Sequence, residues 1–207
     1  MKIHNLKEEK YLQIDDATED EIKDIWKGIL FANSGFEVFF TYNSERKQIK
    51  VPYEYLKEIG TTMVDDTVIY KLKSKDFKPT NILPYTAELV DYINFTEFAN
   101  IHDKKHPNMY WTSERIRQRL NLFEIYILRI ENEITGYIIT MLGKTYNEVM
   151  ICDAVYTDDF KILIETICKE KNEVIYMIDV KERDRFATLE NMGFKMTGVY
   201  TGFKIKI

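Results

Sequence analysis

The side chains of this sequence that could do chemistry include a pair of histidines, two cysteines, several carboxylates at strand ends and many tyrosines. His102 and His106 have the i, i+4 spacing at which two rings on one helix face can bind zinc. However, Pro107 should end that helix, no Glu follows His102, and no Cys lies nearby. We therefore expect no metal site in this segment.

Nucleophilic chemistry has equally little support. Neither Cys152 nor Cys168 has a neighbouring histidine that could stabilise a thiolate, and we expect both to be reduced. No serine hydrolase elbow, phosphate-binding loop or dinucleotide fingerprint occurs. Asp153 with Glu165 or Asp179 could form an acid–base pair, but strand-end carboxylates are common and we do not choose these as catalytic residues.

Alternating strands and helices must position these residues. In the N-terminal part, Thr18 is followed by acidic residues and by apolar residues at helical spacing, which predicts a helix capped by Thr18. A second helix, closed by Gly60, is expected at 52–59. Strands are expected at 11–15, 36–42 and 67–72, which completes a β-α-β-α-β order. Residues 74–84 contain two of the four prolines and are expected to form an extended linker.

The remaining chain predicts an α-α-β-β-β-α-β-α-β order. Helices are expected at 87–101, 112–120, 158–169 and 183–192. Strands are expected at 124–130, 134–141, 147–156 and 173–180, with a closing strand or hairpin at 195–207. We therefore predict an N-terminal unit over residues 1–78 and a larger domain over residues 79–207.

The two parts resemble each other. The stretch YLQIDDATEDEIKDI from Tyr11 aligns without gaps with VMICDAVYTDDFKIL from Val149. After small gaps, FEVFFTY from Phe36 aligns with NEVIYMI from Asn172. This predicts an internal half-repeat. Because half a unit has an exposed sheet edge and little core, it should pack against the rest of the chain.

The C-terminal part, residues 84–207, resembles the GCN5-related N-acetyltransferases (GNAT family). The stretch ILRIENEITGYII, residues 127–139, resembles a strand hairpin of that family. The stretch FATLENMGFKMTG, residues 186–198, resembles the family segment in which a helix ends at a Gly-Phe pair, and Gly193 suits a left-handed helix end. The resemblance implies an α/β (α+β) fold with a GNAT-like mixed twisted sheet flanked by helices, preceded by the smaller N-terminal unit.

The resemblance also implies a site. Acetyl-CoA would be the co-substrate, between splayed strands at 150–156 and 174–180, and backbone N–H groups near Ala154 and Val155 would polarise the thioester carbonyl. The expected cofactor contacts are Ala154, Val155, Tyr156, Thr157, Phe160 and Lys161. Tyr110 and Trp111 would face the amine acceptor, or else simply pack at the start of a helix. Strands paired along their whole length, or a slot filled by side chains, would leave only the topology.

The expected cofactor loop departs from the family. Its Arg/Gln-x-x-Gly-x-Gly/Ala sequence is replaced by AVYTDDFK, without Gly or Arg. Asp158 and Asp159 would repel a pyrophosphate, and Lys161 would offset one of them. Leu189 stands where the family often has its catalytic tyrosine, so Tyr156 and Tyr200 are the catalytic candidates, with Tyr176 a further substitute. The alternative function is a catalytically inactive GNAT-like protein that binds another small ligand or a protein partner.

Composition limits the partners. The net charge of −5 and a pI near 5.4 argue against nucleic acid, which requires a concentrated basic face. No apolar run is long enough for a membrane helix, and the start of the chain does not resemble a secretory signal, so we expect a cytoplasmic protein. The expected partner is a small-molecule or peptide amine, and a homodimer is among the states that the sequence allows.

Overall fold

The structure is a computed structural model that describes residues 1–80, 85–107, 109–170 and 172–207. Residues 81–84 of the predicted linker lie outside the described part, and the linker begins with a 3-10 turn, η2 (Ser74–Asp76). The chain divides into two compact units. Unit 1 contains Met1–Ile69, Ile178–Glu182 and Thr197–Ile207, and unit 2 contains Tyr70–Met177 and Arg183–Met196.

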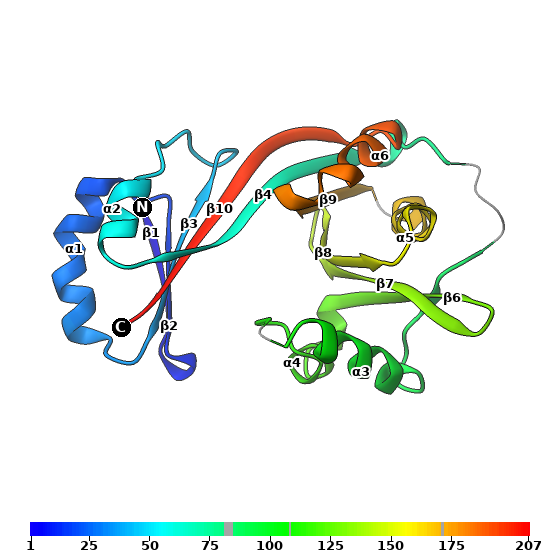
Figure 1. Ribbon diagram of the computed structural model, residues 1–207, viewed down its shortest axis with the longest axis horizontal. Helices are drawn as coiled ribbons and strands as arrows, with labels where there is room; N and C mark the ends of the chain where they lie inside the picture. Colours follow the sequence, from blue (N-terminus) through cyan, green and yellow to red (C-terminus); the bar gives the residue numbers. More distant parts are fainter. Residues whose placement is uncertain (81–84, 108, 171) are drawn as a thin grey trace. The chain divides into compact units, whose positions relative to one another are not determined.

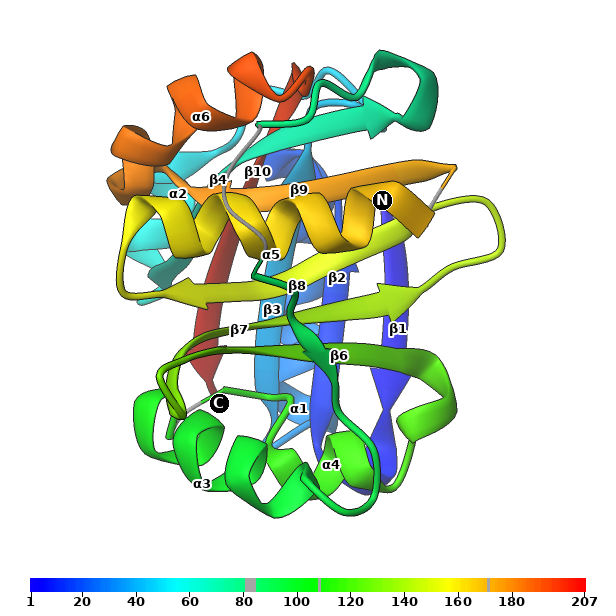
Figure 2. The same ribbon diagram turned by 90° about the vertical axis from the view of Figure 1, so that its right-hand side faces the viewer.

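Unit 1 has the predicted β-α-β-α-β order, preceded by one further strand (Figure 1, and from the side in Figure 2). The sequence does not reveal this first strand, because its residues are mostly exposed and show no apolar face. The elements are β1 (Lys2–Leu6), η1 (Lys7–Glu9), β2 (Tyr11–Asp15), α1 (Glu19–Ala32), β3 (Glu37–Asn43), α2 (Tyr53–Glu58), β4 (Thr62–Lys73) and β10 (Lys195–Lys206). The last two also extend into unit 2.

The sheet of unit 1 places its strands in the order β1, β2, β3, β10 and β4. β2 is parallel to β3, and their register runs from Tyr11↔Glu37 to Asp15↔Thr41, the whole length of β2. β1 is antiparallel to β2, and β10 is antiparallel to β3. The two strands that α1 connects are therefore paired without a gap.

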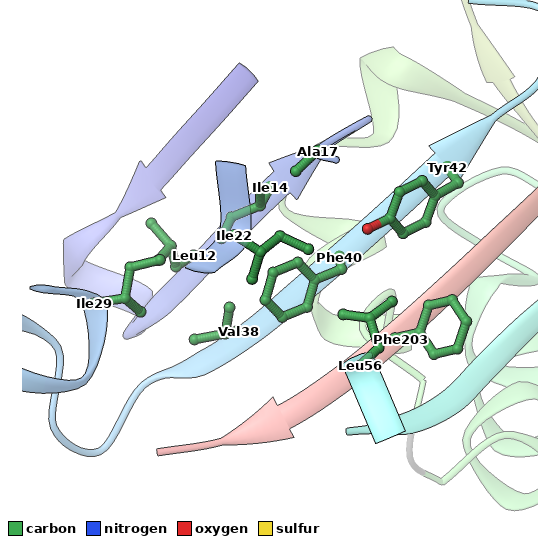
Figure 3. Close-up of a cluster of buried hydrophobic side chains, with 10 residues drawn as sticks. All are labelled: Leu12, Ile14, Ala17, Ile22, Ile29, Val38, Phe40, Tyr42, Leu56 and Phe203. Carbon is green, nitrogen blue, oxygen red and sulfur yellow. The ribbon is translucent and has the colours of Figure 1, made fainter. Parts of the chain in front are cut away.

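One face of this sheet carries the core of unit 1 against α1 and α2 (Figure 3). Alternate residues of a strand point to the same face, so Leu12 and Ile14 lie beside Val38 and Phe40. The helices contribute mainly the side chains of Ile22, Ile29 and Leu56. Burial of each such side chain stabilises the fold by about 1.5–3 kcal/mol.

Thr18 begins α1 as predicted. Its side-chain oxygen accepts the Glu21 N–H at 3.3 Å, and the Glu21 carboxylate accepts the Thr18 N–H at 2.8 Å. This reciprocal capping box satisfies two backbone donors that a helix start would otherwise leave open. The helix ends before Asn33, and Gly35 then adopts a positive φ of 82°.

Unit 2 follows the predicted order of helices and strands, except that a short strand, β5, occupies the beginning of the segment expected to be its first helix. Its elements are β5 (Glu88–Leu89), α3 (Phe95–Lys105), α4 (Ser113–Arg117), η3 (Leu120–Leu122), β6 (Phe123–Ile130), β7 (Glu133–Leu142), β8 (Asn147–Ala154), α5 (Thr157–Glu170), β9 (Glu173–Asp179), η4 (Val180–Arg185) and α6 (Phe186–Asn191). The last residues of β9 and the first of η4 belong to unit 1.

Two predicted helices begin later than expected. The helix expected at 87–101 starts at Phe95, because the Asp91 carboxylate accepts the N–H groups of Ile93 and Asn94 and holds a turn there. The helix expected at 183–192 starts at Phe186, after the 3-10 segment η4. The closing segment is one long strand, β10, rather than a hairpin.

Helices cover both faces of the sheet in unit 2. Phe98 of α3 and Ile116 of α4 pack on one face, against Ile125, Tyr137 and other residues of β6 and β7. α5 packs on β7 and β8 from the opposite face. There Gly136 lets the helix come close, because a Cβ at this position would lie 3.0 Å from the Leu163 side chain and 2.8 Å from the Asp153 carbonyl oxygen.

The predicted fold class is confirmed: the fold is α/β, with a mixed sheet flanked by helices. Both units contain a strand–helix–strand element with parallel strands, β2-α1-β3 and β8-α5-β9. Within the described ranges, no helix combines the length and the apolar character that crossing a bilayer requires.

Candidate functional site

Strand β8 is irregular in the middle. Its antiparallel register with β7 shifts between Ile139↔Ile151 and Thr140↔Val149, so Met150 is an extra residue without a partner on β7. Such a bulge bends a strand and increases its twist. The irregularity therefore redirects the second half of β8.

The parallel pairing of β8 with β9 stops at the same position. It runs from Asn147↔Val174 to Val149↔Tyr176, and no pair of Met150 with Met177 follows in the described part of the chain. The end of this pairing beside the bulge at Met150 is what we expect if the strands part there, as the resemblance predicted.

Backbone groups of the parted half of β8 point toward the side of β9. The Val155 N–H donates to the Thr135 carbonyl on the β7 side at 3.0 Å. Since backbone groups of successive strand residues alternate in direction, those of Cys152 and Ala154 point the other way. The Val155 N–H is thus already used and cannot polarise a thioester, which corrects our expectation for that group.

The side chain of Arg185 occupies this place. Its guanidinium donates to the Cys152 carbonyl at 2.8 Å and to the Ala154 carbonyl at 3.4 Å. The same group lies 4.7 Å from the centre of the Phe160 ring, in a cation–π contact. The pairing of the strands ends as expected, but Arg185 already uses the carbonyl groups of Cys152 and Ala154 that point toward the β9 side.

Sequence reasoning did not identify Arg185. It falls in a segment expected to be an ordinary helix and does not belong to any motif of the family. The local signal that could have indicated it is the charged run KERDR, which η4 forms before α6.

The expected cofactor loop lies around the first turn of α5. Val155 and Tyr156 are exposed, whereas Phe160 is buried against Tyr176 of β9, with 6.3 Å between their ring centres. The Phe160 N–H donates to the Tyr156 carbonyl, which makes Tyr156 the residue that precedes the helix. Of the six predicted residues, Ala154, Val155, Tyr156 and Thr157 are consecutive, and Phe160 and Lys161 follow on the first turns of α5.

The two aspartates of this loop differ. Asp158 is exposed and forms an ion pair with Lys161 at 2.8 Å, as expected for an offsetting charge. Asp159 is only 3% exposed, and its Oδ2 makes no hydrogen bond within the described structure. A buried carboxylate without a full set of partners is costly, so this turn is locally unsatisfied.

The catalytic candidates lie in different units. Tyr156 stands exposed before α5 in unit 2, and Tyr200 lies on β10 in unit 1. Burial, with a smaller contribution from Asp65, raises the pKa of Tyr200. Leu189, at the position of the family's tyrosine, is completely buried in α6 and serves packing.

A buried polar cluster joins α3 to β7. His102 is 0% exposed, and its Nε2 lies 2.7 Å from the Trp111 carbonyl oxygen, which can only accept. His102 therefore donates from Nε2, and its Nδ1 accepts from the Tyr137 hydroxyl at 3.2 Å. Burial lowers the pKa of His102, so the ring is neutral. These contacts use both ring nitrogens.

Asp153 of β8 adjoins this cluster. Its carboxylate lies 3.7 Å from His106 Nε2, an ion-pair distance, and accepts a hydrogen bond from Lys105 at 2.9 Å. His106 and, after it, Lys105 lower the pKa of Asp153 despite its partial burial. Its partners are thus α3 cations, which the sequence spacing did not suggest, whereas Glu165 binds Thr80 and Lys169.

Tyr110 and Trp111 contact each other, with ring centres 5.1 Å apart. Trp111 packs on Phe123 at the edge of the core, and Tyr110 is 38% exposed with the Arg115 guanidinium 4.3 Å from its ring centre. Packing at the start of α4 accounts for Trp111, and Tyr110 presents its ring to solvent.

No protein-family model and no curated protein matches the chain. Solved structures do match. A functionally unknown conserved protein from Staphylococcus epidermidis has a TM-score of 0.71 at 16% identity, over 95% of this chain and 84% of that one. A GCN5-related N-acetyltransferase from Kribbella flavida has a TM-score of 0.62 at 10% identity, over 94% of this chain and 80% of that one.

A second enzyme of that description, from Sphaerobacter thermophilus, has a TM-score of 0.61 at 11% identity, over 99% of this chain and 75% of that one. These matches extend over almost the whole chain, so they include the N-terminal unit. Together with the bulged, parted strand β8, they establish the architecture. This chain has the fold of the GCN5-related N-acetyltransferases.

Proposed function

We propose that the protein is an N-acyltransferase that moves an acetyl group from acetyl-CoA to an amine. The observation that carries this proposal is the parting of β8 from β9 at the Met150 bulge. Beyond the bulge, backbone amides of Cys152 and Ala154 point toward the β9 side. An extended ligand with amides of its own, such as the pantetheine arm of coenzyme A, can pair with them as a further strand would.

The reaction requires little more than positioning. The amine nitrogen attacks the thioester carbonyl carbon, a C–N bond forms and the C–S bond breaks, while the amine loses a proton and the thiolate gains one. Holding the donor between strands supplies much of the rate by orientation. The Ala154 N–H points to the slot and would polarise the carbonyl oxygen, and Tyr156 is our candidate for protonating the thiolate.

Isothermal titration with acetyl-CoA, followed by detection of released thiol with a panel of small and peptide amines, tests the proposal. We expect saturable binding and thiol release that depends on an amine. The matched control variant is Tyr156→Phe, which keeps the ring and removes the hydroxyl, and which should bind acetyl-CoA normally but release thiol more slowly. The absence of heat at millimolar acetyl-CoA would refute the proposal.

A second function, a non-catalytic GNAT-like protein, is favoured by the acidic turn and by Arg185 in the slot. In that case the turn before α5 has lost its affinity for pyrophosphate, because Asp158 and Asp159 oppose the positive helix end. The double variant Asp158→Gly with Asp159→Gly should then bind coenzyme A much more tightly than the natural chain. Tight binding by the natural chain already would count against this second function.

A further inference from the structure

The most specific contact in the slot is made by the chain itself. Arg185 donates to the carbonyls of Cys152 and Ala154, which lie on one side of the same strand. These are the acceptors that the N–H groups of an extended amide ligand would use. Arg185 and such a ligand therefore require the same two oxygen atoms.

The position of Arg185 is well defined. The guanidinium lies over the ring of Phe160, 4.7 Å from its centre, and Phe160 itself is 1% exposed. The planar fork of a guanidinium holds its N–H donors in fixed directions that suit two neighbouring carbonyls, whereas an ammonium group is a compact charge without that fixed geometry. The backbone that carries Arg185 is a short 3-10 segment with a break at Glu182, where φ is −91° and ψ is 35°.

We propose that Arg185 is an intramolecular competitor that closes the donor slot and determines how tightly an amide-bearing donor binds. This inference rests on the proposed function, because it takes the slot to be the donor site. A donor enters only when the guanidinium leaves the Cys152 and Ala154 carbonyls. The free energy of those hydrogen bonds is then subtracted from the binding of every donor.

Pantetheine is the probe that isolates this competition, because it has the two amides of coenzyme A and no phosphate. Its binding is measured by isothermal titration to the full chain and to Arg185→Met, which keeps much of the side-chain stem over Phe160 and removes all donors. We expect Arg185→Met to bind pantetheine at least about tenfold more tightly than the natural chain, since hydrogen bonds from a charged donor are lost from the competing state.

The affinity of Arg185→Lys for pantetheine should lie between those of the natural chain and Arg185→Met, because lysine keeps the charge but lacks the planar fork that matches the two carbonyls. The control is Arg117→Met, which removes the same charge from an exposed position on α4 and should leave the affinity unchanged. Thermal melting of each variant identifies any that does not fold, and Arg185→Lys then provides the comparison.

The outcomes separate this inference from the proposed function. Equal or weaker pantetheine binding by a folded Arg185→Met would overturn the competitor while leaving acyl transfer intact. Tighter pantetheine binding without amine-dependent thiol release from acetyl-CoA would support the competitor and refute the enzyme. Failure of both the natural chain and Arg185→Met to bind pantetheine would overturn both.

Discussion

The two halves of the internal repeat differ where their first strand ends. In β2-α1-β3 the strands pair along all of β2, and the Asp16 N–H continues to the Thr41 carbonyl at 2.8 Å. In β8-α5-β9 the pairing stops at Val149, one residue before the bulge. The open pair therefore has a register shift in the ladder on the other side of its first strand, between β7 and β8, whereas the corresponding ladder between β1 and β2 is regular.

The starts of the two helices also differ: α1 is fully capped and α5 is not. Thr18 and Glu21 form a complete capping box on α1. The gap-free alignment places Tyr156 and Asp159 at the equivalent positions of α5. A tyrosine hydroxyl is too far from the backbone to cap the helix, and Asp159 keeps an oxygen without a hydrogen bond.

In a repeated fold, function is expected in the half that departs from regular pairing and capping. The N-terminal half pairs β2 with β3 along the whole of β2 and caps α1 completely, although the buried Tyr42 hydroxyl has no hydrogen bond among the described residues. The C-terminal half departs from regular pairing and regular capping at one place, and places an arginine there. Departures of this kind are expected where a protein meets a ligand.

The largest effect is expected from removing the bulge. Deletion of Met150 brings Val149 and Ile151 into consecutive register with Thr140 and Ile139, which allows β8 to pair with β9 as β2 pairs with β3. The slot then closes, and acetyl-CoA binding measured by titration should fall at least about a hundredfold, or about 2.7 kcal/mol.

Met150→Ala is the matched control for this deletion, because it keeps the extra residue and hence the bulge. It should bind acetyl-CoA within a few-fold of the natural chain. If the deletion variant folds and still binds as the natural chain does, the slot between β8 and β9 is not the donor site.

Mild acidification should have a smaller effect, a loss of folding stability that is greater in unit 2 than in unit 1. His102 of unit 2 is fully buried with a lowered pKa, whereas the His4 side chain of unit 1 is 41% exposed. The unfolded chain takes up a proton near the ordinary pKa of 6.5, and folded His102 does so only at lower pH. Stability is therefore full above pH 6.5 and falls below it, by at most about 1.4 kcal/mol per pH unit.

The two tryptophans allow each unit to be followed separately by fluorescence during denaturation. Trp111, whose carbonyl accepts from His102, reports on unit 2 in a Trp26→Phe background, and Trp26 reports on unit 1 in a Trp111→Phe background. In His102→Gln the loss of stability that Trp111 reports between pH 7 and pH 5 should shrink, although the side chains of Asp103, Asp153 and His106 remain nearby. If the loss of stability per pH unit is unchanged in this variant, His102 is not the source of that loss.

Element order and the first helix cap were predictable because they depend on local pattern. Thr18, the helical spacing after it and the turn before Ile134 are read directly from neighbouring residues. The parting of the strands was predictable only through the family resemblance. A bulge such as that at Met150 leaves no mark in composition, since any residue can occupy it.

The contents of the site were less predictable, for a physical reason. Arg185 meets Cys152 and Ala154 across about thirty residues of sequence, and Asp153 meets Lys105 across about fifty. Neither pairing follows a periodicity, so hydropathy and spacing do not indicate them. β1 escaped detection because it is held to β2 mainly through the backbone ladder, with one side-chain contact between His4 and Asp15, and shows no apolar pattern.

The smallest effect should come from exchanging the helix caps. Thr18→Ala removes the oxygen that caps α1 and should lower the free energy of unfolding by about 1 kcal/mol. Tyr156→Thr supplies the missing cap to α5 and should raise it by a few tenths to about 1 kcal/mol, measured by denaturant titration. The new capping hydroxyl would accept the N–H groups at the start of α5 that a bound ligand also needs. The Tyr156→Thr variant should therefore bind acetyl-CoA more weakly. Stabilisation by Tyr156→Thr without any loss of binding would show that the start of α5 takes no part in holding the donor.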